Sequence, residues 1–284
     1  MYQILAMNCL ISAYALSVLR LDGIKYGDVQ MTCLGIVMSV SFVSVSRSKP
    51  LDQLSPVRPL RSIFHPSLFF SMVGQFALHL TTMIYLVYEC KKYLPADHPK
   101  EPPKKFEPNI VNSVVFLITA VQQVSVFVVN LKGPPFMGGL SQNSPLMWSL
   151  AITFVGTFLC ASESIPQMNK WLQLEPFPSL SFRNMVLFVL TLDVGGAFLW
   201  DRLMLGVFAF PVLLASIRST TRKELFTMVR VLVMVSMLVY WLATMDYSEI
   251  AKELEKQEKL LAEKSAAGTG GRAFTQSPLS PQEL

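Results

Sequence analysis

The chain has 284 residues, a mean hydropathy of +0.44 and only 15% charged residues. A soluble domain averages about 25% charged residues, so this composition indicates a membrane protein and argues against a soluble one. The net charge of +5 does not point to nucleic acid, because the basic residues fall in loops and the tail, where lipid headgroups are the usual partner. The four cysteines show no C-x-x-C spacing, which favours small packed side chains over a disulfide or metal site.

Six apolar stretches follow one another with only short loops between them. Each approaches the ~20 residues that cross a bilayer as a helix. They run over about 3–19, 29–45, 67–88, 110–131, 146–162 and 184–200. An all-α fold is therefore predicted, a polytopic transmembrane helical bundle formed by residues 1–205. Trp148 and Trp171 are expected to bracket the fifth stretch at the two membrane interfaces, and Trp200 is expected to end the sixth.

The remaining residues are predicted to form three further segments. Residues 206–245 contain an interfacial segment broken by Pro211 and then a seventh span at about 225–245, for which an interfacial helix is the open alternative. Residues 246–264 alternate Glu and Lys at helical spacing, which predicts a solvated charged helix. The Gly-, Ser- and Pro-rich tail, 265–284, is predicted to be disordered.

The orientation of the bundle does not follow from charge. Lys and Arg are nearly balanced between the two sides, so the positive-inside rule gives no direction. The first residues, Met1-Tyr2-Gln3, lead directly into an apolar stretch without the basic start or cleavage pattern of a signal peptide. Such a start is typical of a sequence that begins in the middle of a longer protein.

Polar side chains at membrane depth cost free energy and need partners, so each is a candidate functional residue. For a substrate-facing polar cavity the candidates are Asn8, Asp28, Gln30, Gln122 and Gln123. Structural alternatives stay open. Asn8 fits a helix–helix hydrogen bond, and Asp28 fits an acid favoured by a helix amino terminus. Neighbouring Gln122 and Gln123 point about 100° apart on a helix, so that one can face a cavity while the other bonds a neighbouring helix.

Asp193 is the one acid deep within an apolar stretch, beside Gly195 and Gly196. It is predicted to be an intramembrane structural acid with a satisfied partner, in preference to a proton relay. His79 is expected to be a packed polar residue, and no metal site is expected. The sequence contains no phosphate-binding loop, zinc-protease helix, nucleophile elbow or dinucleotide fingerprint, so no catalytic residue is assigned.

Six short motifs occur in order along the bundle. They are ILAMNCLISAY (4–14), DVQ (28–30), SRSKPL (46–51), FEPNIVNS (106–113), VQQVS (121–125) and NLKGPPF (130–136). Together they resemble the carboxy-terminal membrane half of the type 5 P-type ATPases, and within these the endoplasmic-reticulum subfamily A, the transmembrane-helix dislocases. The resemblance covers about residues 1–205.

The resemblance implies that the six stretches are core membrane helices five to ten of such an ATPase, in a multi-pass protein of the endoplasmic-reticulum membrane. The amino terminus, 47–66 and 131–145 would be cytosolic, and 89–108 and 163–182 lumenal. A complete family member uses ATP and Mg to dislocate misinserted transmembrane helices, or to transport a cationic or peptidic substrate. The implied partners are the lipid bilayer, a client helix and the missing amino-terminal half.

This chain contains no Asp-Lys-Thr-Gly-Thr loop, and phosphoryl transfer needs an aspartate nucleophile, positioned phosphates and a metal. The chain alone is therefore expected to bind no cofactor and to hydrolyse no ATP. A fragment of a longer ATPase and a truncated paralogue both fit, the latter as a non-enzymatic multi-span scaffold or adaptor. An autonomous secondary transporter is disfavoured, because no inverted repeat is visible.

Overall fold

The computed structural model describes residues 2–48, 51, 55–95 and 105–219, and beyond them only 222, 224–227, 229–231, 233, 234 and 237. Within these residues the chain is all-helical and has no strand. Six helices are long and apolar enough to cross a membrane, which confirms the predicted fold. They are α1 (Tyr2–Leu21), α2 (Asp28–Ser46), α3 (Pro66–Lys91), α4 (Ile110–Asn130), α5 (Ser144–Ala161) and α7 (Leu180–Phe208). Shorter helices are η1 (Leu140–Gln142), α6 (Pro166–Trp171) and α8 (Phe210–Ser219).

Four of the long helices, α3, α4, α5 and α7, begin after a residue whose side chain accepts from a free backbone N–H group of the first turn. The side-chain oxygen of Asn109 accepts from the backbone N–H of Asn112 at 2.8 Å, and Ser179 caps α7 in the same way. Pro66 occupies the first turn of α3, where a missing N–H costs nothing. Local sequence therefore sets where these helices start.

The sixth apolar stretch is longer than the sequence predicted, and the expectation that Trp200 ends it is wrong. The helix α7 continues to Phe208, and Asp201, which lies in this added part, is buried and accepts a hydrogen bond from Ser71 on α3. The Trp200 indole N–H donates to the Phe70 carbonyl oxygen at 3.0 Å. Trp200 thus packs against α3, and α8 follows after Ala209.

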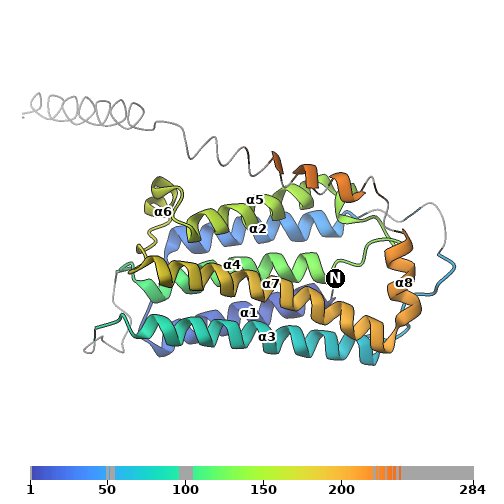
Figure 1. The fold of residues 1–284 in the computed structure, drawn as a ribbon, viewed down its shortest axis with the longest axis horizontal. Helices are drawn as coiled ribbons and strands as arrows, with labels where there is room; N and C mark the ends of the chain where they lie inside the picture. Colours follow the sequence, from blue (N-terminus) through green and yellow to red (C-terminus); the bar gives the residue numbers. More distant parts are fainter. Residues whose placement is uncertain are drawn as a thin grey trace, which may run out of the picture. The chain divides into compact units, whose positions relative to one another are not determined.

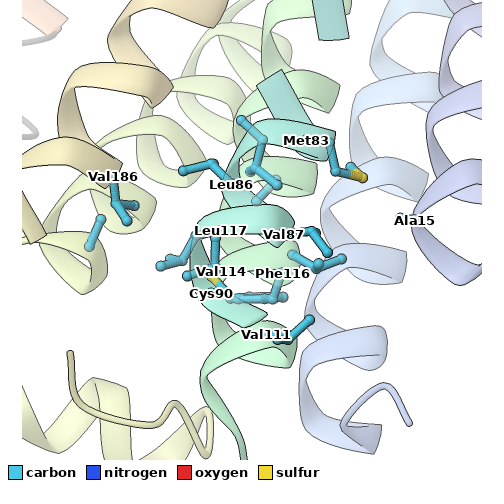
Figure 2. Packing of buried hydrophobic residues seen from close by; sticks show 14 of the residues in the cluster. Ala15, Met83, Leu86, Val87, Cys90, Val111, Val114, Phe116, Leu117 and Val186 are labelled. Carbon is cyan, nitrogen blue, oxygen red and sulfur yellow. The ribbon is translucent and has the colours of Figure 1, made fainter. Parts of the chain in front are cut away.

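The centre of the bundle is α4, in which every residue except Val128 is buried. The helices α1, α3, α5 and α7 all pack on it, and Figure 1 shows it between the α1 and α3 pair and the α2 and α5 pair. Figure 2 shows the apolar contact between α3 and α4, where Leu86 and Cys90 lie beside Val114 and Leu117. Exposed apolar side chains on the outer helices form a surface suited to lipid.

The helices α1 and α2 are neighbours in sequence but pack on different partners. α1 packs mainly on α4 and α3, whereas α2 packs mainly on α5 (Figure 1). Only residues 22–27 link them, with Gly23 at the positive φ of 66° that a tight turn requires. A flank of α4 therefore lies between α1 and α2.

Internal contacts divide the chain into one unit of residues 1–239 and a second of 240–284. The second unit lies outside the described residues, and so do the predicted charged helix at 246–264 and the tail at 265–284. The predicted seventh span at 225–245 also falls mostly outside them.

Candidate functional site

Asp193 on α7 lies fully buried at the junction of three helices. His79 Nδ1 lies 2.9 Å from Asp193 Oδ2, and the Thr82 hydroxyl donates to Asp193 Oδ1. Gln122 Nε2 donates to the same Oδ1 at 3.2 Å and to the His79 carbonyl oxygen at 2.8 Å. We call these four residues the Asp193 cluster. Their hydrogen bonds connect α3, α4 and α7 in an otherwise apolar region.

A second buried polar group, the Asp201 cluster, lies farther along the same three helices. It consists of the buried residues Ser71, Gln75, Asn130 and Asp201, together with the half-buried Lys132, which follows the end of α4. The Ser71 hydroxyl donates to Asp201 Oδ1 at 2.6 Å, and Lys132 Nζ lies 3.5 Å from that oxygen. Asn130 Nδ2 donates to Gln75 Oε1 at 2.9 Å, and Gln75 Nε2 donates to Ser71.

Sequence reasoning missed this second cluster, although a periodic signal was present. Ser71, Gln75 and His79 follow one another at four-residue intervals, and Asp193 and Asp201 are eight residues apart. Both spacings place polar groups on one face of a helix. Two polar faces of matching spacing predict that α3 and α7 pack against each other.

Gln30 and Asp28, both candidates for substrate contact, lie at the start of α2. Gln30 is buried, and its Nε2 donates to Asn112 Oδ1 at 2.9 Å and to the Leu172 carbonyl oxygen at 3.0 Å. Its Oε1 accepts from the backbone N–H of Gly27. Asp28 is exposed as the first residue of the helix. The Gln30 amide is thus fully used in joining α2 to α4 and to the segment after α6.

Asn8 is buried on α1, where its Nδ2 donates to the Ile4 carbonyl oxygen of the same helix at 2.9 Å. Gln123 on α4 makes only a long contact, 3.4 Å from its Nε2 to Ser12 Oγ. Gln122, its neighbour, points instead to Asp193. The structure therefore brings Gln122 and Asp193 together, and it does not gather the five candidates into one cavity.

Between α1 and α2 lies a cavity of about 170 Å³, which we call the α1/α2 cleft. Gln123 is the one of the five candidates that lines it. The lining residues are Ser12, Ala15, Leu16, Tyr26, Met31, Leu34, Gly35, Met38, Thr119 and Gln123. Leu16 and Met31 are 47% and 45% exposed, so the cleft opens toward the outer, lipid-facing side of the bundle.

The described residues offer no group of three or more His, Cys, Asp or Glu side chains that could hold a metal ion. The α1/α2 cleft carries neutral hydrogen-bonding groups, supplied by Ser12, Tyr26, Thr119 and Gln123, among apolar walls. Neutral donors and acceptors in an apolar cleft are suited to non-covalent recognition within a membrane.

No family model matches the chain. It is 39% identical over 209 residues to the endoplasmic reticulum transmembrane helix translocase spfA of Aspergillus fumigatus, which covers 74% of this chain and 16% of that protein. It is 40% identical over 212 residues to the probable manganese-transporting ATPase PDR2 of Arabidopsis thaliana, covering 74% and 18%. The endoplasmic reticulum transmembrane helix translocase of Saccharomyces cerevisiae is 38% identical over 197 residues, covering 69% and 16%.

The chain spans about a sixth of the length of these relatives. The aligned length of 209 residues is about the length of chain from the start of α1 at Tyr2 to the end of α7 at Phe208. These matches and the six apolar helices together identify the chain as a multi-pass protein of the endoplasmic-reticulum membrane. By sequence it belongs with the type 5 P-type ATPases of the transmembrane-helix translocase subfamily, and it corresponds to a portion of their membrane domain.

Proposed function

We propose that this chain is the substrate-facing part of the membrane domain of an ATPase that removes misinserted transmembrane helices from the endoplasmic-reticulum membrane. One observation carries the proposal. A bundle similar to proteins named transmembrane helix translocases has a cleft between α1 and α2 that opens to the lipid-facing side. A helix arriving from the bilayer would meet this cleft without crossing the packed core.

The walls of the cleft support this role. Leu16 on α1 and Met31 on α2 present apolar surface at its mouth, and the half-buried Met38 also lines it. Methionine is flexible and polarisable, so it adapts to partners of different shape. Such walls are suited to apolar client helices in general, and less to a client with one particular sequence.

In this proposal ATP and Mg bind to the remainder of the ATPase, which would be the partner of this chain. The lipid bilayer surrounds the helices of this chain. The described residues of this chain supply binding surface and helix packing. Energy for extraction would reach the cleft through movement of the helices that flank it.

Photocrosslinking in microsomes tests the proposal. A photoreactive amino acid placed at Leu16 or Met31 should capture a radiolabelled single-span helix inserted into the same membrane. The matched controls are Phe188 and Leu192 on α7, which are 66% and 50% exposed on another surface of the bundle. Equal capture from α1, α2 and α7 would contradict a specific substrate face.

A chimera separates this function from that of a non-enzymatic scaffold. The segment of the Saccharomyces cerevisiae relative that aligns with this chain is replaced by the matching residues of this chain. If the bundle is a working translocase portion, the chimera should retain ATP-dependent extraction of a model helix. A stable, correctly located chimera that hydrolyses ATP without extracting helices would favour the scaffold.

A further inference from the structure

Three buried polar atoms face the α1/α2 cleft without a hydrogen-bond partner among the described residues. They are the Tyr26 hydroxyl, Thr119 Oγ1 and Gln123 Oε1. Thr119 and Gln123 are 2% and 5% exposed and lie near the middle of α4. A buried polar atom left unpaired costs about 1–3 kcal/mol. Three such atoms at one cavity indicate a site whose partner is a separate molecule.

Thr119 differs from other threonines of the bundle in a way that supports this interpretation. Helical threonines usually donate to the carbonyl oxygen of the preceding turn. Six others do so within their own helices. They are Thr32, Thr81, Thr82, Thr153, Thr157 and Thr191. The Thr119 hydroxyl makes no such bond within the described residues and is available to the cleft.

Tyr26 reaches the cleft from the segment that links α1 to α2. Burial raises the pKa of Tyr26, and the nearby Thr119 hydroxyl offsets part of this shift. The two hydroxyls nevertheless do not meet hydrogen-bond geometry with each other. Tyr26 therefore stays protonated at neutral pH and can donate a hydrogen bond as well as accept one.

The chemistry of these groups defines the ligand. Two hydroxyls can donate or accept, the Gln123 carbonyl oxygen accepts, and no charged side chain lines the cavity. A charged ligand would therefore be buried without a countercharge, which is costly. The cavity volume of about 170 Å³ is well above the ~10–15 Å³ that a single water requires, which leaves room for a small amide or hydroxyl side chain.

We propose that the α1/α2 cleft selects client helices that carry a neutral hydrogen-bonding side chain, such as Asn, Gln, Ser or Thr, near mid-membrane. This inference rests on the proposed function and adds a selection rule to it. Ser12, Thr119 and Gln123 lie near the middle of α1 and α4, where phospholipids present only acyl chains. A polar side chain on an inserted helix is the ligand chemistry that brings hydrogen bonds to this depth.

Two variants of the full chain test the inference without disturbing the fold. The double variant Tyr26→Phe, Thr119→Val removes both hydroxyls and keeps the shapes of the side chains. Gly35→Leu fills the cleft from its α2 wall, where an added Cβ meets no atom within 4 Å. Gly195→Leu on α7 is the matched control, because its Cβ position is equally open but lies outside the cleft.

The probe is a synthetic 21-residue Leu/Ala helix with one central Asn, compared with the same helix carrying Leu there. Both are reconstituted with the purified chain in phosphatidylcholine vesicles, with a photocrosslinker at Met31. The Asn helix should be captured about three- to tenfold more than the Leu helix, the range that one interhelical hydrogen bond supplies in a membrane. The preference should disappear in the double variant and in Gly35→Leu, and persist in Gly195→Leu.

The outcomes separate the two proposals. Equal capture of both helices by the unmodified chain would overturn the selection rule, leave the proposed function standing, and indicate a cleft that holds only water. Capture of neither helix would contradict the proposed function as well. A fall of several degrees in the thermal midpoint of the double variant would show that the hydroxyls are structural, and this would also overturn the inference.

Discussion

Substitution of Asp193 should lower the stability of the helix bundle. Replacing it by Asn removes one of the two carboxyl oxygens that His79, Thr82 and Gln122 contact. We expect Asp193→Asn to lower the free energy of unfolding by about 1–3 kcal/mol, the cost of leaving a buried hydrogen-bonding group unsatisfied. Denaturant unfolding in mild detergent measures this. Asp28→Asn, at an exposed helix start, is the control, and an equal loss in both variants would contradict the assignment.

Gln122 and Gln123 give a prediction in which each residue is the control for the other. Gln122→Leu removes one donor from Asp193 Oδ1 and one from the His79 carbonyl oxygen, and it should destabilise the fold by about 1–3 kcal/mol. Gln123→Leu gives up one long contact and also removes a buried unpaired oxygen, so its unfolding free energy should stay the same or rise. Unfolding in detergent micelles compares the two, and a reversed order would show that their placements are wrong.

The sequence predicted that these two glutamines point in different directions, but it gave no means of assigning the directions. Helical geometry fixes the angle between neighbours, whereas the rotation of α4 depends on residues in α3 and α7 that are distant in sequence. Thr119 and Tyr26 were missed for a related reason. A threonine in an apolar helix normally bonds its own backbone, and only the geometry shows that this one does not.

At the scale of elements, the contact between α3 and α7 depends on Gly74. A Cβ at Gly74 would come within 1.8 Å of the Trp200 indole nitrogen, which donates to the Phe70 carbonyl oxygen. Gly74→Ala should displace the ring and destabilise the fold by about 1–3 kcal/mol, as overpacking does. Gly195→Ala, in open space, should be neutral or stabilising by up to about 1 kcal/mol. Thermal unfolding measures both, and a stabilising Gly74→Ala would contradict this packing.

Hydropathy located six helices because each element that crosses a bilayer must be long and apolar. It misplaced the end of α7 because Asp201 and Lys132 neutralise each other's cost only in the folded bundle. A hydropathy average over a stretch of sequence counts the full free-energy cost of placing each polar residue in a membrane, whereas contacts in the folded protein remove part of that cost. The six long helices among the described residues were therefore predictable, and the end of α7 was not.

At the scale of the whole molecule, the purified 284-residue chain should neither bind ATP nor form a phosphoenzyme. The sequence lacks the Asp-Lys-Thr-Gly-Thr loop on which phosphoryl transfer in the family depends. Incubation with γ-labelled ATP and acid precipitation measures this, with the Saccharomyces cerevisiae relative as the positive control. A hydroxylamine-sensitive label on this chain would contradict the prediction.

The burial of α4 has a consequence for what this helix contacts while the protein is being synthesised. Every residue of α4 except Val128 is covered by other helices, yet α5 and α7 follow α4 in the chain. When α4 leaves the ribosome, the neighbours that will cover part of its surface have not been synthesised. Chains truncated near residue 145 should therefore leave α4 exposed to lipid and membrane chaperones. Because α4 contains no cysteine, one is introduced into it, and this cysteine should react with thiol probes in the truncated chain and be protected once α5 and α7 are present.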